Sequence, residues 1–250
     1  MQCSTSAFRG FLAAMLAAAL SAAIAATASA ELRPGARNCP PLEPVDFVDP
    51  VVPGLPKPEV IGYASLAFGE RHESVPVDSI VMHTTEVDLF GTLGIFTDPN
   101  AQVSAHFTIA ADGTIYQHVA TGDRAWHATY YNGRSIGIEM VGFAHSPDTW
   151  NDANLDALTD LLAWLSVAYD IELTRPGGNA YDFPNDYFDA PGVVAHGQIQ
   201  PWNRTDPGPY FPWDDVLAEA QAKAVPEPTV ASALTLGVGA FTLRRRSRRA

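Results

Sequence analysis

Short runs of β-branched and apolar residues, separated by turn residues, constrain the fold of this chain most. They occupy residues 79–83, 103–111, 114–119, 135–141 and 192–196. Such runs between turn signals are typical of strands. Asp112 and Gly113 stand between two of them and predict a hairpin turn. The chain is therefore expected to build a β-sheet.

Two other segments carry helical spacing. Apolar residues recur at intervals of three and four from Leu155 to Tyr169, which places them on one helix face. Asn151 or Asp152 can cap the start of this helix. Residues 213–224 predict a second, closing helix. Because strands and helices are mixed along the chain, the expected class is α/β or α+β, with helices covering the sheet.

Composition limits the class of protein. The chain has 250 residues, of which 47% are hydrophobic, enough for one folded domain with tails. Its two cysteines exclude a disulfide-stapled scaffold and a cysteine-rich zinc module. Residues 31–225 hold 27 acidic and 9 basic residues. Their net charge of −18 disfavours nucleic acid as a partner, because phosphates would be repelled.

The N-terminus has the pattern of a secretory signal. Arg9 is followed by an apolar run over residues 11–26, and Ala28-Ser29-Ala30 provides the small residues that precede cleavage. We expect residues 1–30 to be a signal peptide cleaved after Ala30, and the chain to be exported from a bacterium; a permanent N-terminal anchor is the alternative. Residues 31–60 contain eight prolines and predict an extended lead-in.

Residues 225–250 have three parts in a fixed order. Pro-Glu-Pro at 226–228 precedes a 15-residue apolar run at 229–243, and arginines dominate residues 244–249. The run is short of the ~20 residues that span a bilayer comfortably. The segment resembles the PEP-CTERM sorting tail, which implies processing by an exosortase and at least transient attachment to the membrane. An ordinary C-terminal anchor, with the basic end in the cytoplasm, is the alternative.

Four residues suggest metal-assisted hydrolysis. His83 and His196 each end an apolar run, and Asp206 lies in a loop rich in Pro and Gly. Zinc in hydrolytic enzymes takes three such ligands and leaves a position for water. Glu139, on another predicted strand, can accept a proton from that water. The other interpretation is that each histidine is a hydrogen-bonded structural residue at a strand end.

Local motifs favour the first interpretation. They occur in one order over residues 75–215: IVMHTT at 80–85, VSAHF at 103–107, DGTIYQ at 112–117, RAWHA at 124–128, SIGIE at 135–139, VAH at 194–196 and DPGPYFPW at 206–213. Together they look like the zinc-dependent N-acetylmuramoyl-L-alanine amidases, a family that includes phage amidase lysozymes and peptidoglycan recognition proteins.

The resemblance implies a fold and a site. The fold is a central mixed β-sheet flanked by helices, with Zn²⁺ at the floor of a substrate groove. The zinc ligands of the family fall on His83, His196 and Asp206, and its catalytic glutamate falls on Glu139. Arg204 stands where the family commonly has a lysine. It would stabilise the oxyanion but, because it stays charged, could not donate a proton.

The resemblance also implies an activity for residues 61–224. The expected substrate is peptidoglycan or a muropeptide, cut between N-acetylmuramic acid and L-alanine. A recognition module that binds without hydrolysis and a zinc hydrolase with another amide substrate are the rivals. Trp126 and His127 are expected to line the groove, with a structural role for His127 as the alternative. We expect His106 to be structural and His118 to lie at the surface.

Overall fold

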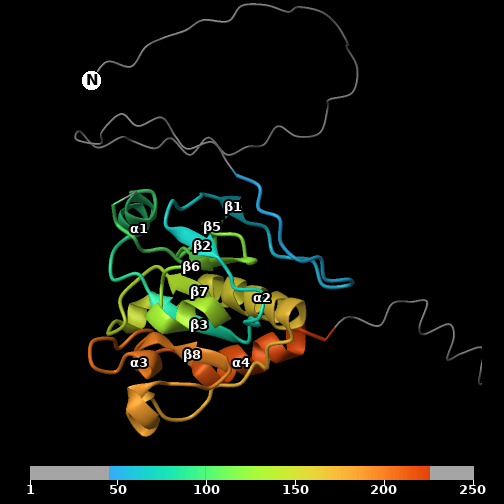
Figure 1. Cartoon of the computed structure of the whole chain (residues 1–250). Coiled ribbons are helices and arrows are strands. Elements are labelled where there is room, and N and C mark those ends of the chain that lie inside the picture. The colour runs from blue at the N-terminus through green and yellow to red at the C-terminus, as the bar shows by residue number, and fades with distance from the viewer. Residues whose placement is uncertain (1–44, 99, 226–250) are drawn as a thin grey trace, which may run out of the picture. The chain divides into compact units, whose positions relative to one another are not determined.

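The computed structural model describes residues 45–98 and 100–225 (Figure 1). The predicted signal peptide and the segment from residue 226 onward lie outside these ranges. The helices and strands are β1 (Ile61–Gly62), β2 (Phe68–Glu70), β3 (Ser79–Thr84), α1 (Leu89–Phe96), β4 (Phe107–Ile109), β5 (Ile115–Gln117), β6 (Asp123–Ala125), β7 (Ser135–Met140), α2 (Asp152–Tyr169), β8 (Gly192–Ala195), α3 (His196–Ile199) and α4 (Trp213–Lys223).

Six of the strands form one mixed sheet in the order β1-β5-β4-β7-β3-β8. Only β4 and β5 are antiparallel neighbours in this sheet, as expected for the predicted hairpin, and the other neighbours run parallel. β2 and β6 form a separate antiparallel pair. The predicted class, a central mixed sheet flanked by helices, is confirmed.

One face of the sheet is covered by α2 and α4, which pack against each other (Figure 1). Alternate residues of β3 and β7, such as Met82 and Ile138, point to this face and contact the apolar side of α2. Trp164 of α2 is fully buried there. The capped start of α2 is as predicted, because the Asn151 side chain accepts hydrogen bonds from the first turn.

The other face of the sheet has a smaller apolar cluster. It consists of Val81, Ala128, Tyr131, Ala180, Phe188, Val194 and Ile199. Val81 and His83 share this face because side chains alternate along a strand. The candidate site therefore lies on the face that α2 and α4 leave uncovered.

The end of the predicted lead-in is attached to the domain. Residues 45–60 contain no helix or strand, but the Asp49 side chain is only 3% exposed and accepts hydrogen bonds from the Thr121 backbone, the Thr121 hydroxyl and Gln117. Lys57 forms an ion pair with Asp49 at 2.6 Å. These contacts extend the folded unit N-terminally of β1.

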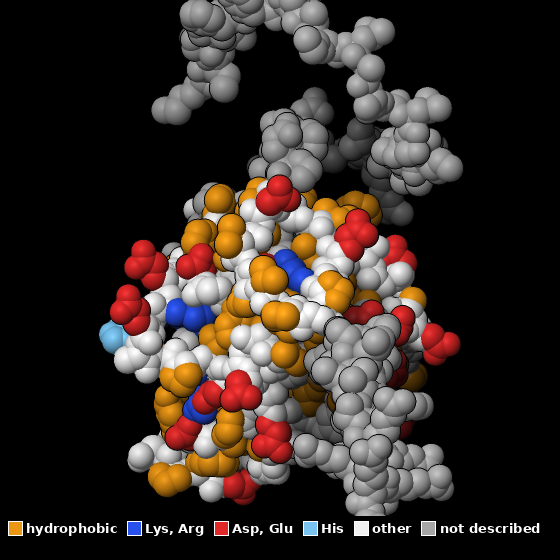
Figure 2. All heavy atoms as spheres, turned by 90° about the vertical axis from the view of Figure 1, so that its right-hand side faces the viewer, with side chains coloured by type: hydrophobic (Ala, Val, Ile, Leu, Met, Phe, Trp, Pro, Cys, Tyr) orange, Lys and Arg blue, Asp and Glu red, His pale blue; other side chains and the backbone are white. Residues whose placement is uncertain are grey.

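Charged side chains are spread over one face of the domain. Acidic side chains are spread across the face shown in Figure 2 rather than gathered into one patch. Within the residues that the structure describes, no helix is both long and apolar enough to cross a bilayer.

Candidate active site

Strand register brings the first two site residues together. β3 and β7 are parallel, and His83 pairs directly with Glu139. Both side chains point to the face opposite α2, because their neighbours Met82 and Ile138 point into the α2 core. β8 lies on the other side of β3 and leads directly into α3, whose first residue is His196. His196 is thus the first helical residue after the strand, whereas the sequence predicted it as the last residue of the strand.

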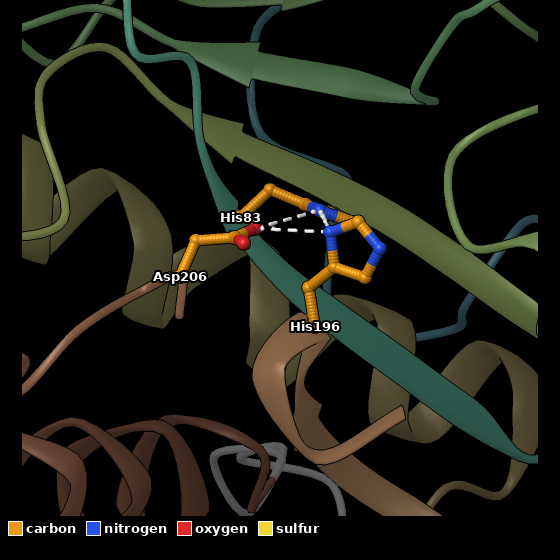
Figure 3. Close-up of side chains that lie close together, drawn as sticks. All are labelled: His83, His196 and Asp206. Carbon is orange, nitrogen blue, oxygen red and sulfur yellow. Dashed lines mark hydrogen bonds and ion pairs between the residues drawn. The ribbon is translucent and has the colours of Figure 1, made fainter. Parts of the chain in front are cut away.

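The loop after α3 returns Asp206 to the same point. The Asp206 Oδ2 atom lies 3.1 Å from the Nδ1 atoms of both His83 and His196, and these two nitrogens are 3.0 Å apart. Figure 3 shows the three side chains pointing toward one another from β3, α3 and the loop. All three residues are buried. Within the described part of the chain, they are a group of His, Cys, Asp or Glu side chains that can hold a metal ion.

Each histidine is held from behind through its second ring nitrogen. The Nε2 atom of His196 lies 2.8 Å from the Gln200 side-chain carbonyl, which can only accept. His196 therefore donates from Nε2 and keeps a lone pair on Nδ1. The Nε2 atom of His83 lies 3.0 Å from Nδ1 of His127. Ring nitrogens held in this way are typical of metal-binding histidines.

The electrostatics of the cluster favour a neutral His83 and a charged Asp206. Burial lowers the pKa of His83 to about 4, and the neighbouring His196 adds to the effect. Burial alone would raise the pKa of Asp206, but the adjacent His196 and His83 side chains outweigh it and hold the pKa below its usual range. Neutral imidazole and ionised carboxylate are the forms that bind metal.

The surroundings of Glu139 shift its pKa in the opposite direction from that of Asp206. Its Oε2 atom is shut off from solvent and finds no hydrogen-bond partner among the residues that the structure describes. Burial raises the pKa of Glu139 to about 8, and the negative charges of Asp206 and Glu86 contribute, while Arg204 opposes the shift. Its carboxyl group lines the same pocket as the cluster. An unpartnered carboxyl group with a raised pKa is characteristic of a proton-transfer residue.

The pocket over the cluster has a charged side and an apolar side. Arg204 lines it but is exposed, and within the described ranges its side chain bonds only to the Asn203 carbonyl, at 3.1 Å. Trp126 and His127, which the sequence suggested for a substrate groove, also line this pocket. Apolar side chains from the α1 region complete the wall: Val87, Ile95, Phe96 and Val103. The pocket can therefore accept a ligand that has both polar and apolar parts.

Comparison with known proteins decides the family. A family model described as N-acetylmuramoyl-L-alanine amidase matches residues 73–209, which is more than half of the chain. The chain belongs to this amidase family. The matched range includes all four residues of the buried site, and it confirms the resemblance that the sequence motifs carry.

The amidase relatives differ in how much of their length the chain spans. N-acetylmuramoyl-L-alanine amidase A of Achromobacter lyticus is 36% identical over 140 residues, which cover 55% of this chain and 79% of that protein. The 1,6-anhydro-N-acetylmuramyl-L-alanine amidase AmpD of Escherichia coli K12 is 36% identical over 120 residues, covering 45% of this chain and 55% of AmpD. The chain thus spans about half of AmpD.

A solved structure supports the fold. The crystal structure of a selenomethionine derivative of AmpD superposes with a TM-score of 0.52 at 25% identity. The alignment covers 72% of this chain and all of that one. The mixed sheet described above is therefore an amidase fold.

Two histidines behave differently from what the sequence suggests. His118 was expected at the surface, but it is buried and bonds to the Tyr63 carbonyl and the Thr108 hydroxyl. The expectation was wrong because β1 and its flanking loop cover the end of the hairpin. His106 is buried and accepts from the Gly137 backbone at 2.9 Å, in keeping with a structural role. The spacing of the motifs does not predict the contact between His127 and His83.

Proposed function

We propose that this chain is a zinc-dependent N-acetylmuramoyl-L-alanine amidase. It hydrolyses the amide between the lactyl group of N-acetylmuramic acid and the L-alanine of the stem peptide. The observation that carries the proposal is the unpartnered Glu139 carboxyl group beside the buried His83, His196 and Asp206 cluster. The names of the amidase relatives support the substrate class.

The donor set of the cluster fits zinc. Two imidazole nitrogens and one carboxylate oxygen leave a fourth position open, which is the arrangement of catalytic zinc sites. The three ligand atoms lie 3.0–3.1 Å apart. A tetrahedral ion with bonds of about 2.0–2.2 Å needs them only a few tenths of an ångström further apart. When bound, zinc supplies a Lewis acid that acidifies water toward a pKa of ~7 and polarises the scissile carbonyl.

Glu139 moves the proton in this mechanism. Its free Oε2 atom takes a proton from the attacking water and later gives it to the nitrogen of the leaving L-alanine. The raised pKa of Glu139 suits the second step, because the protonated form is a competent acid near neutral pH. A cation held by the neighbouring cluster opposes this shift and favours the ionised form needed for the first step.

Arg204 binds the charge that develops on the carbonyl oxygen. It is free to turn into the pocket, since its one hydrogen bond is to the adjacent Asn203 carbonyl. Removing such a donor typically costs roughly 2.7–4 kcal/mol of transition-state stabilisation. Arg204 cannot replace Glu139 as a proton donor, because a guanidinium stays charged.

We also propose export of the enzyme. The signal pattern of residues 1–30 and the PEP-CTERM-like tail from residue 226 support a mature domain outside the cytoplasm. The tail would hold the protein at the membrane until an exosortase processes it. Expression in a bacterium with and without an exosortase, followed by mass spectrometry of both termini, tests this part separately.

Digestion of purified peptidoglycan tests the activity. The zinc-loaded protein is expected to release stem peptides that begin with L-alanine, detected by mass spectrometry. A chelator and Glu139→Ala should each abolish the release, and added zinc should restore only the chelated sample. Wall binding without released peptide would instead assign the chain to non-hydrolysing recognition modules. Release of other fragments would indicate a different amide substrate.

A further inference from the structure

His127 lines the pocket and also contacts His83 of the metal cluster. Its ring makes an edge contact with the His83 ring, with centroids 5.2 Å apart. Its Nδ1 atom lies 3.0 Å from His83 Nε2, and its Nε2 atom lies 3.3 Å from the Ser135 hydroxyl. The ring therefore bridges β3 and the start of β7.

The Tyr131 carbonyl sets the direction of the hydrogen bonds that link Ser135, His127 and His83. The Ser135 hydroxyl lies 2.7 Å from the Tyr131 backbone carbonyl, which can only accept. Ser135 has one proton, so it donates to Tyr131 and accepts from His127 Nε2. A neutral imidazole carries one N–H, so His127 Nδ1 is an acceptor. His83 must then donate from Nε2, which leaves the lone pair of its Nδ1 pointing at His196 and Asp206.

The backbone around His127 is built for this position. The Asn132 side chain accepts from the backbone N–H of His127 at 3.0 Å and of Ala128 at 2.6 Å. Gly137 of β7 lies under the ring, where an added Cβ would stand 2.7 Å from ring atoms Cγ and Nδ1. The glycine of the SIGIE motif thus provides the space that His127 occupies.

We propose that His127 is a positioning residue for the metal. The Tyr131 carbonyl, Ser135 and His127 fix His83 in the tautomer whose Nδ1 can bind zinc. Gln200 fixes His196 in the same tautomer from the other side. Together with the Asp206 carboxylate, the site then presents three acceptor atoms to one another, and a cation between them relieves their repulsion. The inference rests on the proposed zinc site, but not on the identity of the substrate.

Zinc affinity tests the role of His127 without any activity measurement. Competition with a chromophoric chelator on the purified protein should show that His127→Ala weakens zinc binding by about 10–100-fold, as is usual for partners of metal-binding histidines. Ser135→Ala should weaken it toward the lower end of that range. His118→Ala is the matched control, because His118 is also buried but bonds to Tyr63 and Thr108. It should lower the melting temperature and leave zinc affinity unchanged.

Nitrogen NMR on the zinc-loaded wild-type protein tests the proton order directly and needs no variant to fold. We expect His127 as the Nε2–H tautomer and a scalar coupling across the hydrogen bond between His83 Nε2 and His127 Nδ1. An Nδ1–H tautomer of His127, or wild-type zinc affinity in both His127→Ala and Ser135→Ala, overturns the proposal. Failure of the wild-type protein to bind zinc would overturn the metal centre itself. Wild-type protein that binds zinc but has no amidase activity would count against the proposed function only.

Discussion

The two faces of the central sheet bury different kinds of side chain. The face under α2 and α4 is mostly apolar, with Ile80 and Met82 of β3 in the same core as Trp164. The opposite face begins with Val81 and then turns polar, with His83 and Glu139 side by side. Alternation along β3 and β7 therefore separates a stabilising face from a reactive one, and the same strands supply both.

The difference between the two faces shows how the fold tolerates an unfavourable buried group in its site. The Glu139 Oε2 atom is shut off from solvent and has no partner among the described residues, which disfavours the charged form. The apolar face offsets this by burying large side chains, each of which contributes roughly 1.5–3 kcal/mol. We therefore expect substitutions on the two faces to have separable effects, on catalysis and on stability.

Glu139→Gln should break the reactive face with the largest effect. We expect kcat for a soluble muropeptide to fall by about 10²–10⁴-fold, because the proton carrier is lost. The melting temperature of the zinc-free protein should stay the same or rise, since a buried amide needs no charge. A kcat within tenfold of wild type would remove Glu139 from the mechanism.

Trp164→Ala should break the apolar face instead. It leaves a large cavity beneath the sheet and is expected to lower the free energy of unfolding by about 3–5 kcal/mol. Zinc affinity of the folded protein should not change. Urea unfolding measures the first quantity, and Val167→Ala on the same helix is the control, because Val167 is 41% exposed. Equal losses for the two variants would contradict the packing described here.

The pH dependence of stability sharpens the comparison. In the folded zinc-free protein the pKa of Glu139 is raised from 4.5 to about 8 by burial and by nearby carboxylates. The folded state then binds one more proton than the unfolded state between these values, so this group lowers stability as pH rises from about 4.5 to about 8. Unfolding of wild type and Glu139→Gln at pH 5 and pH 8 should show the excess decline only in wild type. Parallel declines would contradict the assignment.

Gly137→Ala should lower the free energy of unfolding less than Trp164→Ala does. The new methyl group would meet the His127 ring, so we expect a loss of about 1–3 kcal/mol together with weaker zinc binding. Gly94→Ala in α1 is the matched control, since nothing lies within 4 Å of the added Cβ. It should stabilise the protein by about 0.5–1 kcal/mol because alanine favours helix. Calorimetry with a zinc titration separates the two, and an unaffected zinc site in Gly137→Ala would contradict the role of that glycine.

Local patterns predicted those parts of the fold that depend on near neighbours. The spacing of leucines in α2 and its Asn151 cap predicted the helix, and Asp112-Gly113 predicted the hairpin. β1, β2 and β6 are only two or three residues long, too short to leave a periodic signal. Strand order also has no local signal, because β3 acquires β7 and β8 as neighbours from segments more than 50 residues away.

The sequence motifs indicated four candidate site residues but not the tertiary contacts around them. His83, His196, Asp206 and Glu139 were proposed because each lies in a recognisable motif, and the structure brings them together. The position of His127 behind His83 depends on how the loop before β7 crosses Gly137, which is a tertiary contact. The burial of His118 depends on a distant segment around Tyr63 for the same reason.

A crystal of the zinc-soaked protein, with diffraction data collected at the zinc absorption edge, tests the central claim most directly. The account predicts one strong anomalous peak within bonding distance of His83 Nδ1, His196 Nδ1 and the Asp206 carboxylate, with the Glu139 carboxyl group facing the open position. A peak held by other residues, or an empty cluster at saturating zinc, would contradict the assignment of the polar face as a metal-dependent active site.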